Sequence, residues 1–185
     1  ETWAFPRDPI DMLVGFSNAD AGAMAARRLA AAGRRRVAFV GRASGRGVLR
    51  LDGFRRAAAE AGLEIVREIF LREVSGLADG RAAYRTLAAE RRGAEAVFCA
   101  NDLLAAGFLI EARADGLVIP RDLAIVGFGD NDVATQGDPG LTTITFDAEA
   151  IGRTAGRLVL DRFSGVVSAE ASHTVPLTIV ERGSV

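Results

Sequence analysis

The sequence has little of the residue types that build metal sites and catalytic centres. It contains one cysteine, Cys99, and one histidine, His173, which leaves no internal disulfide framework and no zinc site made of several cysteines. No apolar run approaches the ~20 residues of a membrane span, and residues 1–6 lack the basic, then apolar, plan of a signal peptide. We therefore expect no disulfide, no bound metal and no membrane contact.

An excess of charge of one sign is also missing. The chain carries 23 basic residues, all of them arginine, against 24 acidic residues, and its net charge is −1. A nucleic-acid-binding surface normally appears as a clear basic excess, so this balance argues against a DNA-binding module in this chain alone.

Length and composition are those of an ordinary globular chain. With 185 residues, 49% apolar and 25% charged, the chain has room for one domain or two small ones. Its first residue is Glu1 instead of methionine, which leads us to expect a fragment of a longer protein. Because no targeting segment is evident, we expect that protein to be cytoplasmic.

Short β-rich runs alternate with helical stretches as far as Phe128. The runs VAFV (37–40) and AVFCA (96–100) are continuously apolar, which is typical of strands buried on both faces of a parallel sheet. We expect strands at 12–16, 36–41, 64–71, 95–100 and 123–128, and helices at 18–32, 48–61, 77–92 and 102–115. Right-handed crossovers then predict an α/β fold, a doubly wound parallel sheet with helices on both faces.

The alternation changes after Phe128. A polar loop at 129–140 precedes a predicted strand at 141–145, a helix at 147–163 and a last strand at 174–180. The helix has apolar residues at helical spacing along one face: Ala148, Ile151, Ala155, Leu158 and Val159. Such a face requires an apolar partner surface.

Ligands of open α/β sheets bind at the carboxyl ends of the strands, where the chain order reverses, so polar residues there are candidates. Arg50 is expected in the opening turn of a helix, where the helix dipole disfavours a cation. It is either an ordinary surface arginine or a fork for a carboxylate or a vicinal hydroxyl pair. Arg42 and Arg46, expected in the adjoining loop, either assist it or are merely solvated.

Asn101 and Asp102 directly follow the run AVFCA and open the next predicted helix. Either residue suits the helix N-cap, since a short polar side chain can accept from the first free backbone N–H groups. An amide at this strand end also offers a donor and an acceptor to ligand hydroxyls. Both roles are satisfied if Asp102 caps the helix and Asn101 faces the ligand.

Signatures of nucleotide, calcium and catalytic sites are incomplete. The loop GRASGRG (41–47) lacks the GK[ST] ending of a phosphate loop, and residues 130–132 lack the later residues of a calcium loop. His173 has no evident partner, Ser17 is not in a GxSxG elbow, and Cys99 lies in an apolar strand. We expect no cofactor and no enzymatic activity.

Six segments carry a resemblance to a known family. They are GFSNADAGAMAARRLAAAGRRRVAFVG (15–41), RLDGFRRAAAEAGL (50–63), AVFCANDLLAAGFL (96–109), GLVIPRDLAIVGFGD (116–130), PGLTTITFDAEAIGRTA (139–155) and ERGSV (181–185). In this order they resemble the effector-binding core of the LacI/GalR (lactose/galactose repressor) family of transcriptional regulators, which has the type I periplasmic-binding-protein fold. The resemblance covers nearly the whole chain.

That fold has two lobes joined by three crossings, with the effector between them. The resemblance implies that residues 1–16 end the first lobe, 17–144 form the second, 145–164 return as a helix to the first, and 165–185 form a loop and the final crossing strand. It also implies a DNA-binding head before Glu1, so that operator DNA would be bound only through that missing part. A homodimer is implied as well, formed partly by the helix after Asn101 and by residues 137–139.

The resemblance assigns the polar side of the effector site. Arg50 would grip hydroxyl or carboxylate groups, with Arg46 beside it, and Asn101 would face the effector. Gly129 stands where the family usually has a cleft carboxylate. Either Asp130 supplies a carboxylate instead, or that hydroxyl contact is lost.

The apolar side of the site departs from the family pattern too. Ser75 stands where sugar- and purine-binding members often place an aromatic platform, and Trp3, near the other lip of the cleft, would supply apolar contact in its place. The segments WAFP (3–6), PIDMLVGFSN (9–18), VFCAND (97–102) and RGSV (182–185) most resemble the gluconate-repressor branch. The implied effector is a small sugar or an acyclic sugar acid such as gluconate.

These observations leave three functions to consider for the chain. The leading one is an effector-sensing domain of a bacterial transcriptional regulator. The alternative is a periplasmic sugar-binding protein of a transporter, which the repressor-like segments and the missing signal peptide disfavour. A sugar-processing enzyme is the third, and it lacks evident catalytic residues.

Overall fold

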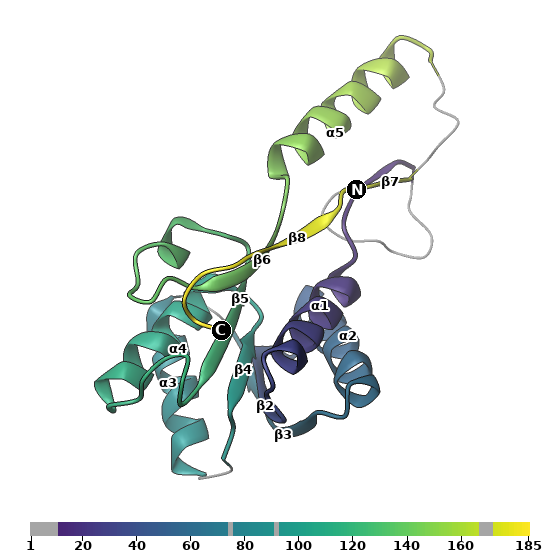
Figure 1. The fold of residues 1–185 in the computed structure, drawn as a ribbon. Helices are drawn as coiled ribbons and strands as arrows, with labels where there is room; N and C mark the ends of the chain where they lie inside the picture. The colour runs from purple at the N-terminus through teal and green to yellow at the C-terminus, as the bar shows by residue number, and fades with distance from the viewer. Residues whose placement is uncertain (1–10, 74–75, 91–92, 167–171) are drawn as a thin grey trace.

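The computed structural model describes residues 11–73, 76–90, 93–166 and 172–185. Strands and helices alternate along the chain, as Figure 1 shows. The strands are β1 (Leu13–Gly15), β2 (Arg36–Arg42), β3 (Glu64–Leu71), β4 (Ala96–Cys99), β5 (Ala124–Phe128), β6 (Thr142–Phe146), β7 (Ser172–Thr174) and β8 (Leu177–Val180). The helices are α1 (Asn18–Ala31), α2 (Arg46–Glu60), α3 (Leu77–Ala89), α4 (Asp102–Ala114) and α5 (Ala148–Phe163), with a 3-10 turn η1 (Asp132–Ala134).

Six strands form the main sheet in the order β3-β2-β4-β5-β6-β8. All neighbouring pairs are parallel except β6 and β8, which are antiparallel. The chain first moves outward from β2 to β3 and then continues on the other side of β2 with β4, so its order reverses between β2 and β4. In sheets of this kind that point of reversal is where ligands bind.

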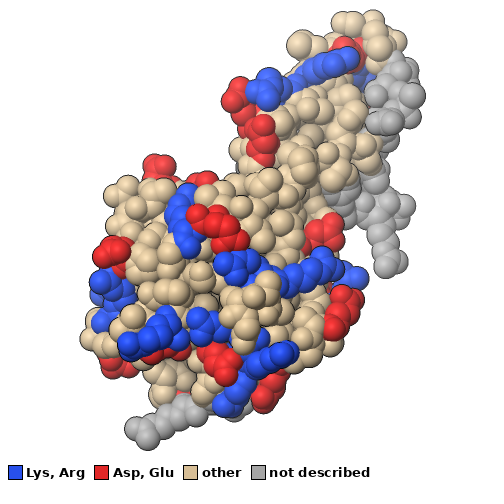
Figure 2. All heavy atoms as spheres, viewed as in Figure 1, with Lys and Arg blue, Asp and Glu red and all other residues tan. Residues whose placement is uncertain are grey.

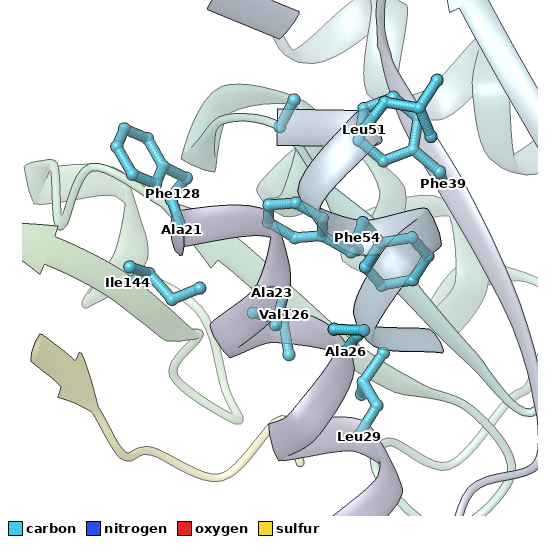
Figure 3. Close-up of a cluster of buried hydrophobic side chains, with 14 of the residues drawn as sticks. Ala21, Ala23, Ala26, Leu29, Phe39, Leu51, Phe54, Val126, Phe128 and Ile144 are labelled. Carbon is cyan, nitrogen blue, oxygen red and sulfur yellow. The ribbon is translucent and has the colours of Figure 1, made fainter. Parts of the chain in front are cut away.

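Helices cover both faces of the main sheet, so the predicted doubly wound α/β fold is confirmed. On one face, side chains of α1 (Ala21, Ala26 and Leu29) lie among Phe39, Phe54 and Phe128 in one apolar cluster (Figure 3). On the other face, α3 and α4 pack over a second cluster that includes Val40, Val97 and Ile125. Burial on both faces explains why β2 and β4 are apolar without alternation.

A second, smaller part stands beside the main sheet. β1 and β7 form a two-stranded parallel sheet, and α5 projects away from the main body next to them (Figure 1). Ile151 and Leu158 of α5 are buried with Val14 and Val175, and Ala155 packs against the same cluster, so three of the five residues of the predicted apolar stripe have a partner surface. Val159 does not belong to that buried face, since it is 47% exposed.

Several predicted boundaries are wrong. Helix α2 begins at Arg46 and not at 48, and α3 ends at Ala89 and not at 92. The single strand predicted at 174–180 is two strands in two sheets, β7 beside β1 and β8 beside β6. Pro176 lies between them and has no backbone N–H to donate to a strand ladder, which separates the two pairings.

Charges of both signs are mixed over the surface. Figure 2 shows arginine and acidic side chains interspersed over the main body on the face it presents. Several of them are ion pairs, including Arg55 with Glu68 and Arg85 with Glu111. Among the described helices, none combines the length and the apolar character that crossing a membrane requires.

Candidate functional site

A cavity of about 630 Å³ lies at the carboxyl ends of the parallel strands. Its lining comes from the segments that follow β1, β2, β4, β5 and β6 and from the first turns of α2. The lining residues are Phe16, Arg42, Ser44, Gly45, Arg46, Gly47, Arg50, Ala100, Asn101, Leu104, Phe128, Gly129, Asn131, Phe146 and Ala148. The cavity therefore includes the reversal point between β2 and β4, and its volume suits a small-molecule ligand.

Arg50 is the buried cation of this cavity. Its guanidinium lies 3.6 Å from the centre of the Phe128 ring, and its Nη1 donates to the Ala100 carbonyl oxygen at 2.7 Å. Its Nε has no hydrogen-bond partner, and no carboxylate of the described residues lies within ion-pair distance of it. A cation removed from water normally requires an anion beside it, so the site has a place for one.

Burial and, to a smaller extent, the nearby charge of Arg46 lower the pKa of Arg50 from 12.5 to about 9. The guanidinium thus stays a cation at neutral pH.

Because α2 begins at Arg46, Arg50 lies in the second turn of the helix and not in the opening turn. Arg46 is the first helical residue and not a loop residue. Arg42 is the last residue of β2. Both of these arginines line the cavity, and both are exposed.

Asn101 takes both of the roles that were divided between Asn101 and Asp102, and the predicted capping role of Asp102 is wrong. Asn101 is the N-cap of α4, where its Oδ1 accepts from the Leu104 N–H at 2.8 Å, and it also lines the cavity. Asp102 does not cap the helix and is fully buried. Its Oδ1 accepts from the Thr143 hydroxyl at 2.6 Å and its Oδ2 from the Asn131 backbone N–H at 2.8 Å.

Burial raises the pKa of Asp102, and these two hydrogen bonds offset part of that rise. Asp102 is a support beneath the cavity and does not line it.

Asp130 does not supply the carboxylate that Gly129 lacks. Its Oδ1 accepts from Nη2 of Arg182 at 2.6 Å, and Asp130 is absent from the cavity lining. Arg182 also donates to the Leu141 carbonyl oxygen, which fixes it over this loop. Since Asp130 is paired outside the cavity, the lining carries three arginines and no acidic residue among the described residues.

Sequence reasoning missed Asn131, which lines the cavity two residues beyond Gly129. It also missed an aromatic group beneath the cavity. Phe16 stacks on Phe146 with ring centres 4.3 Å apart, and Phe128 lies 5.6 Å from Phe16. Each of these residues ends or closely follows a strand, which is the signal by which they could have been found.

Two predicted site residues, Trp3 and Ser75, lie outside the described residues. The residues considered for catalysis are not at the cavity. His173 is in β7, and Cys99 is a buried strand residue whose thiol pKa is raised by burial. Within the described ranges, no group of three His, Cys, Asp or Glu residues could hold a metal ion. The lining thus combines cations, amides and aromatic rings, which is an arrangement for binding an anion.

The doubly wound sheet and its cavity define a ligand-binding domain of the periplasmic-binding-protein type. In agreement, the sequence profile of the periplasmic binding protein-like domain family matches residues 26–185. The chain belongs to this family and, within it, to the LacI family of transcriptional regulators, as their effector-binding core.

Three similar proteins support that membership. The HTH-type transcriptional regulator GntR of Pseudomonas aeruginosa is 39% identical over 173 residues, which cover 92% of this chain and 50% of the relative. A crystal structure of a LacI family transcriptional regulator from Silicibacter pomeroyi matches with a TM-score of 0.87 and 32% identity, covering 100% of this chain and 68% of that one. A complex of the transcriptional regulator CelR with cellobiose matches with a TM-score of 0.87 and 30% identity, covering 99% and 57%.

The chain spans about half the length of the curated relatives it matches. These relatives are transcriptional regulators and not enzymes or transport proteins by name.

Proposed function

We propose that this chain is the effector-sensing domain of a bacterial transcriptional regulator and that its effector is a small sugar acid. The observation that carries the proposal is Arg50, a buried cation at the strand reversal point with no anionic partner among the described residues. A carboxylate can take two parallel hydrogen bonds from such a guanidinium, which a neutral ligand cannot match in strength. An acyclic aldonate such as gluconate supplies the carboxylate and a chain of hydroxyls.

The regulator assignment is favoured over a transporter binding protein because the relatives are HTH-type regulators. In the whole protein, operator DNA would be bound only through a separate helix-turn-helix head, in the cytoplasm. No cofactor is needed for this function.

Sensing would work by a shift between two lobe arrangements. Phe16 follows β1, Phe146 ends β6 and Ala148 begins α5. These residues line one cavity together with Arg50 and Asn101 of the main body. We assign residues 17–144 to one lobe, and residues 1–16 and 145–164 to the other, with a final crossing at 165–185. An effector that contacts both lobes stabilises one arrangement by its differential affinity and thereby changes the placement of the DNA-binding heads.

A neutral sugar is the second candidate effector, since a complex of the relative CelR with cellobiose is known. The two candidates differ in charge, so they can be separated by a matched pair of ligands. D-Gluconate and D-glucitol have the same carbon chain and differ in a terminal carboxylate against a hydroxymethyl group.

Calorimetry at pH 7 is expected to show that the chain binds gluconate at least 30-fold more tightly than glucitol, since a charged hydrogen-bonded pair contributes about 2–3 kcal/mol. The preference should be constant from pH 6 to 8, where the carboxylate is ionised and Arg50 is cationic. Above a pH of about 9 the free protein must take up a proton to bind the anion, so gluconate affinity should fall with rising pH. Glucitol binding at least as tight as gluconate would contradict the proposal.

We also propose that the chain forms a homodimer. Leu103 and Ile110 of α4 are exposed, and on α5 Leu160 and Phe163 are 67% and 86% exposed. Covering large apolar side chains contributes roughly 1.5–3 kcal/mol each, so these surfaces favour association with a second copy.

Light scattering coupled to size exclusion is expected to give a dimer or a larger species at tens of micromolar. Replacing Leu160 and Phe163 together with glutamate should shift the chain towards monomer, because two buried charges would disfavour the contact. Val118→Glu, at an exposed apolar residue elsewhere, is the control and should leave the mass unchanged. A wild-type monomer that binds no hydrophobic dye would contradict the dimer.

A further inference from the structure

The Asn131 side chain lies at the edge of the cavity, in the space next to Gly129 that a side chain at position 129 would enter. The Gly129 backbone has φ +125°, a conformation that favours glycine, and a Cβ built there would lie 2.7 Å from Nδ2 of Asn131. A side chain at position 129 would therefore require the Asn131 side chain to move from its present place. The Asn131 amide occupies the volume that a side chain at 129 would take.

Asn131 is held in this place by a buried support. Its backbone N–H donates to Asp102 Oδ2 at 2.8 Å, and its Nδ2 approaches the same oxygen at 3.5 Å. Asp102 is in turn fixed by the Thr143 hydroxyl. The residue between, Asp130, has φ +53° and is turned to Arg182, which leaves Asn131 as the polar side chain that this loop presents to the cavity.

Hydrogen-bond acceptors are scarce in the cavity. The side chains of Arg42, Arg46 and Arg50 can only donate, and Oδ1 of Asn101 already accepts from Leu104. Among the described lining side chains, this leaves the Ser44 hydroxyl, Oδ1 of Asn131 and the second lone pair of Asn101 Oδ1 as acceptors. A polyol ligand has several hydroxyl groups whose protons need acceptors once they leave water.

We propose that Asn131 is a specificity-determining residue, whose Oδ1 accepts a hydrogen bond from one hydroxyl of an effector held by Arg50. The inference deepens the proposed function and rests on it, because it assigns the recognition of the hydroxyl chain after the carboxylate is bound. The cavity then selects ligands that combine an anionic head with a hydroxyl at one position. Asn131 thus takes the place of a side chain at position 129, where the backbone conformation favours glycine.

The test is calorimetry of the chain with D-gluconate and with its monodeoxy analogues, each lacking one hydroxyl. Asn131→Ala is expected to weaken gluconate binding by about five- to tenfold, the effect of one lost hydrogen bond. For one analogue, the affinity of the wild type should be lower than its affinity for gluconate by a similar factor. Asn131→Ala should bind that analogue as tightly as the wild type does. Gln136→Ala, which removes an exposed amide from the same loop outside the lining, should change nothing.

The melting temperature of Asn131→Ala separates recognition from structure, since the anchoring backbone N–H remains and should keep the protein as stable as the wild type. If Asn131→Ala weakens the binding of gluconate and of every analogue equally, or weakens none of them, the role of Asn131 is overturned. The proposed function still stands in that case if gluconate binding depends on Arg50. No binding of gluconate by the wild type would overturn both. If Asn131→Ala weakens the binding of gluconate but leaves the binding of one analogue unchanged, both the role of Asn131 and the proposed function are supported.

Discussion

Arg50→Met is expected to weaken gluconate binding by about 30–150-fold, because a charge-assisted pair contributes about 2–3 kcal/mol. The methionine keeps an apolar stem against Phe128 and removes the guanidinium that donates to Ala100. The melting temperature should not fall, since the variant also removes a buried cation that has no anion beside it among the described residues. Calorimetry and thermal unfolding of the same samples measure both effects.

Arg56→Met is the matched control for that variant. Arg56 is an exposed residue of the same helix, lies outside the cavity lining, and its loss changes the net charge equally. It should leave gluconate affinity unchanged. Unaltered affinity in Arg50→Met would remove Arg50 from the site and with it the reason to expect an anionic effector.

The main sheet was predictable because its strands are buried on both faces. Continuous apolar runs such as VAFV and AVFCA become β2 and β4, and the separating helices have one side against the sheet. The pairing of strands that lie far apart in the sequence was harder to predict. β7 and β8 look like one strand locally, and only their different partners, β1 and β6, divide them.

In the site, positions were predictable and side-chain directions were not. Arg50 and Asn101 could be expected at the cavity because each follows a strand that meets the same edge of the sheet. Asp130 was misplaced because its partner, Arg182, comes from the far end of the chain. Asn131 was missed because its direction depends on the backbone conformation of Gly129. The closeness of Asn131 to the end of β5 was a signal for its position, but the direction of neither side chain leaves a local signal in the sequence.

Glycines inside helices carry another kind of hidden information. On helix propensity alone Gly22 and Gly53 weaken α1 and α2, by about 1 kcal/mol each relative to alanine. In the structure they allow the two helices to touch. A Cβ at Gly22 would lie 1.8 Å from the carbonyl oxygen of Arg50, and one at Gly53 would lie 1.8 Å from that of Ala19. The contact thus positions the helix turn that carries Arg50.

Gly22→Ala is therefore expected to destabilise the protein by about 3 kcal/mol, because the new methyl group meets backbone, which cannot rotate away. For a chain of this size that lowers the melting temperature by roughly 6–12 °C. Gluconate affinity should fall as well, since α2 must move away from α1 and takes Arg50 with it. Thermal unfolding followed by circular dichroism, with calorimetry below the transition, measures both.

Two further variants isolate the cause. Gly152→Ala in α5 makes the same chemical change where a Cβ would meet nothing within 4 Å, and it should stabilise the protein slightly through helix propensity. Gly22→Ala combined with Gly53→Ala should lose less stability than the sum of the single losses, because both methyl groups separate the same pair of helices. Additive losses, or a Gly22→Ala protein as stable as Gly152→Ala, would show that close packing of α1 on α2 does not hold Arg50 in place.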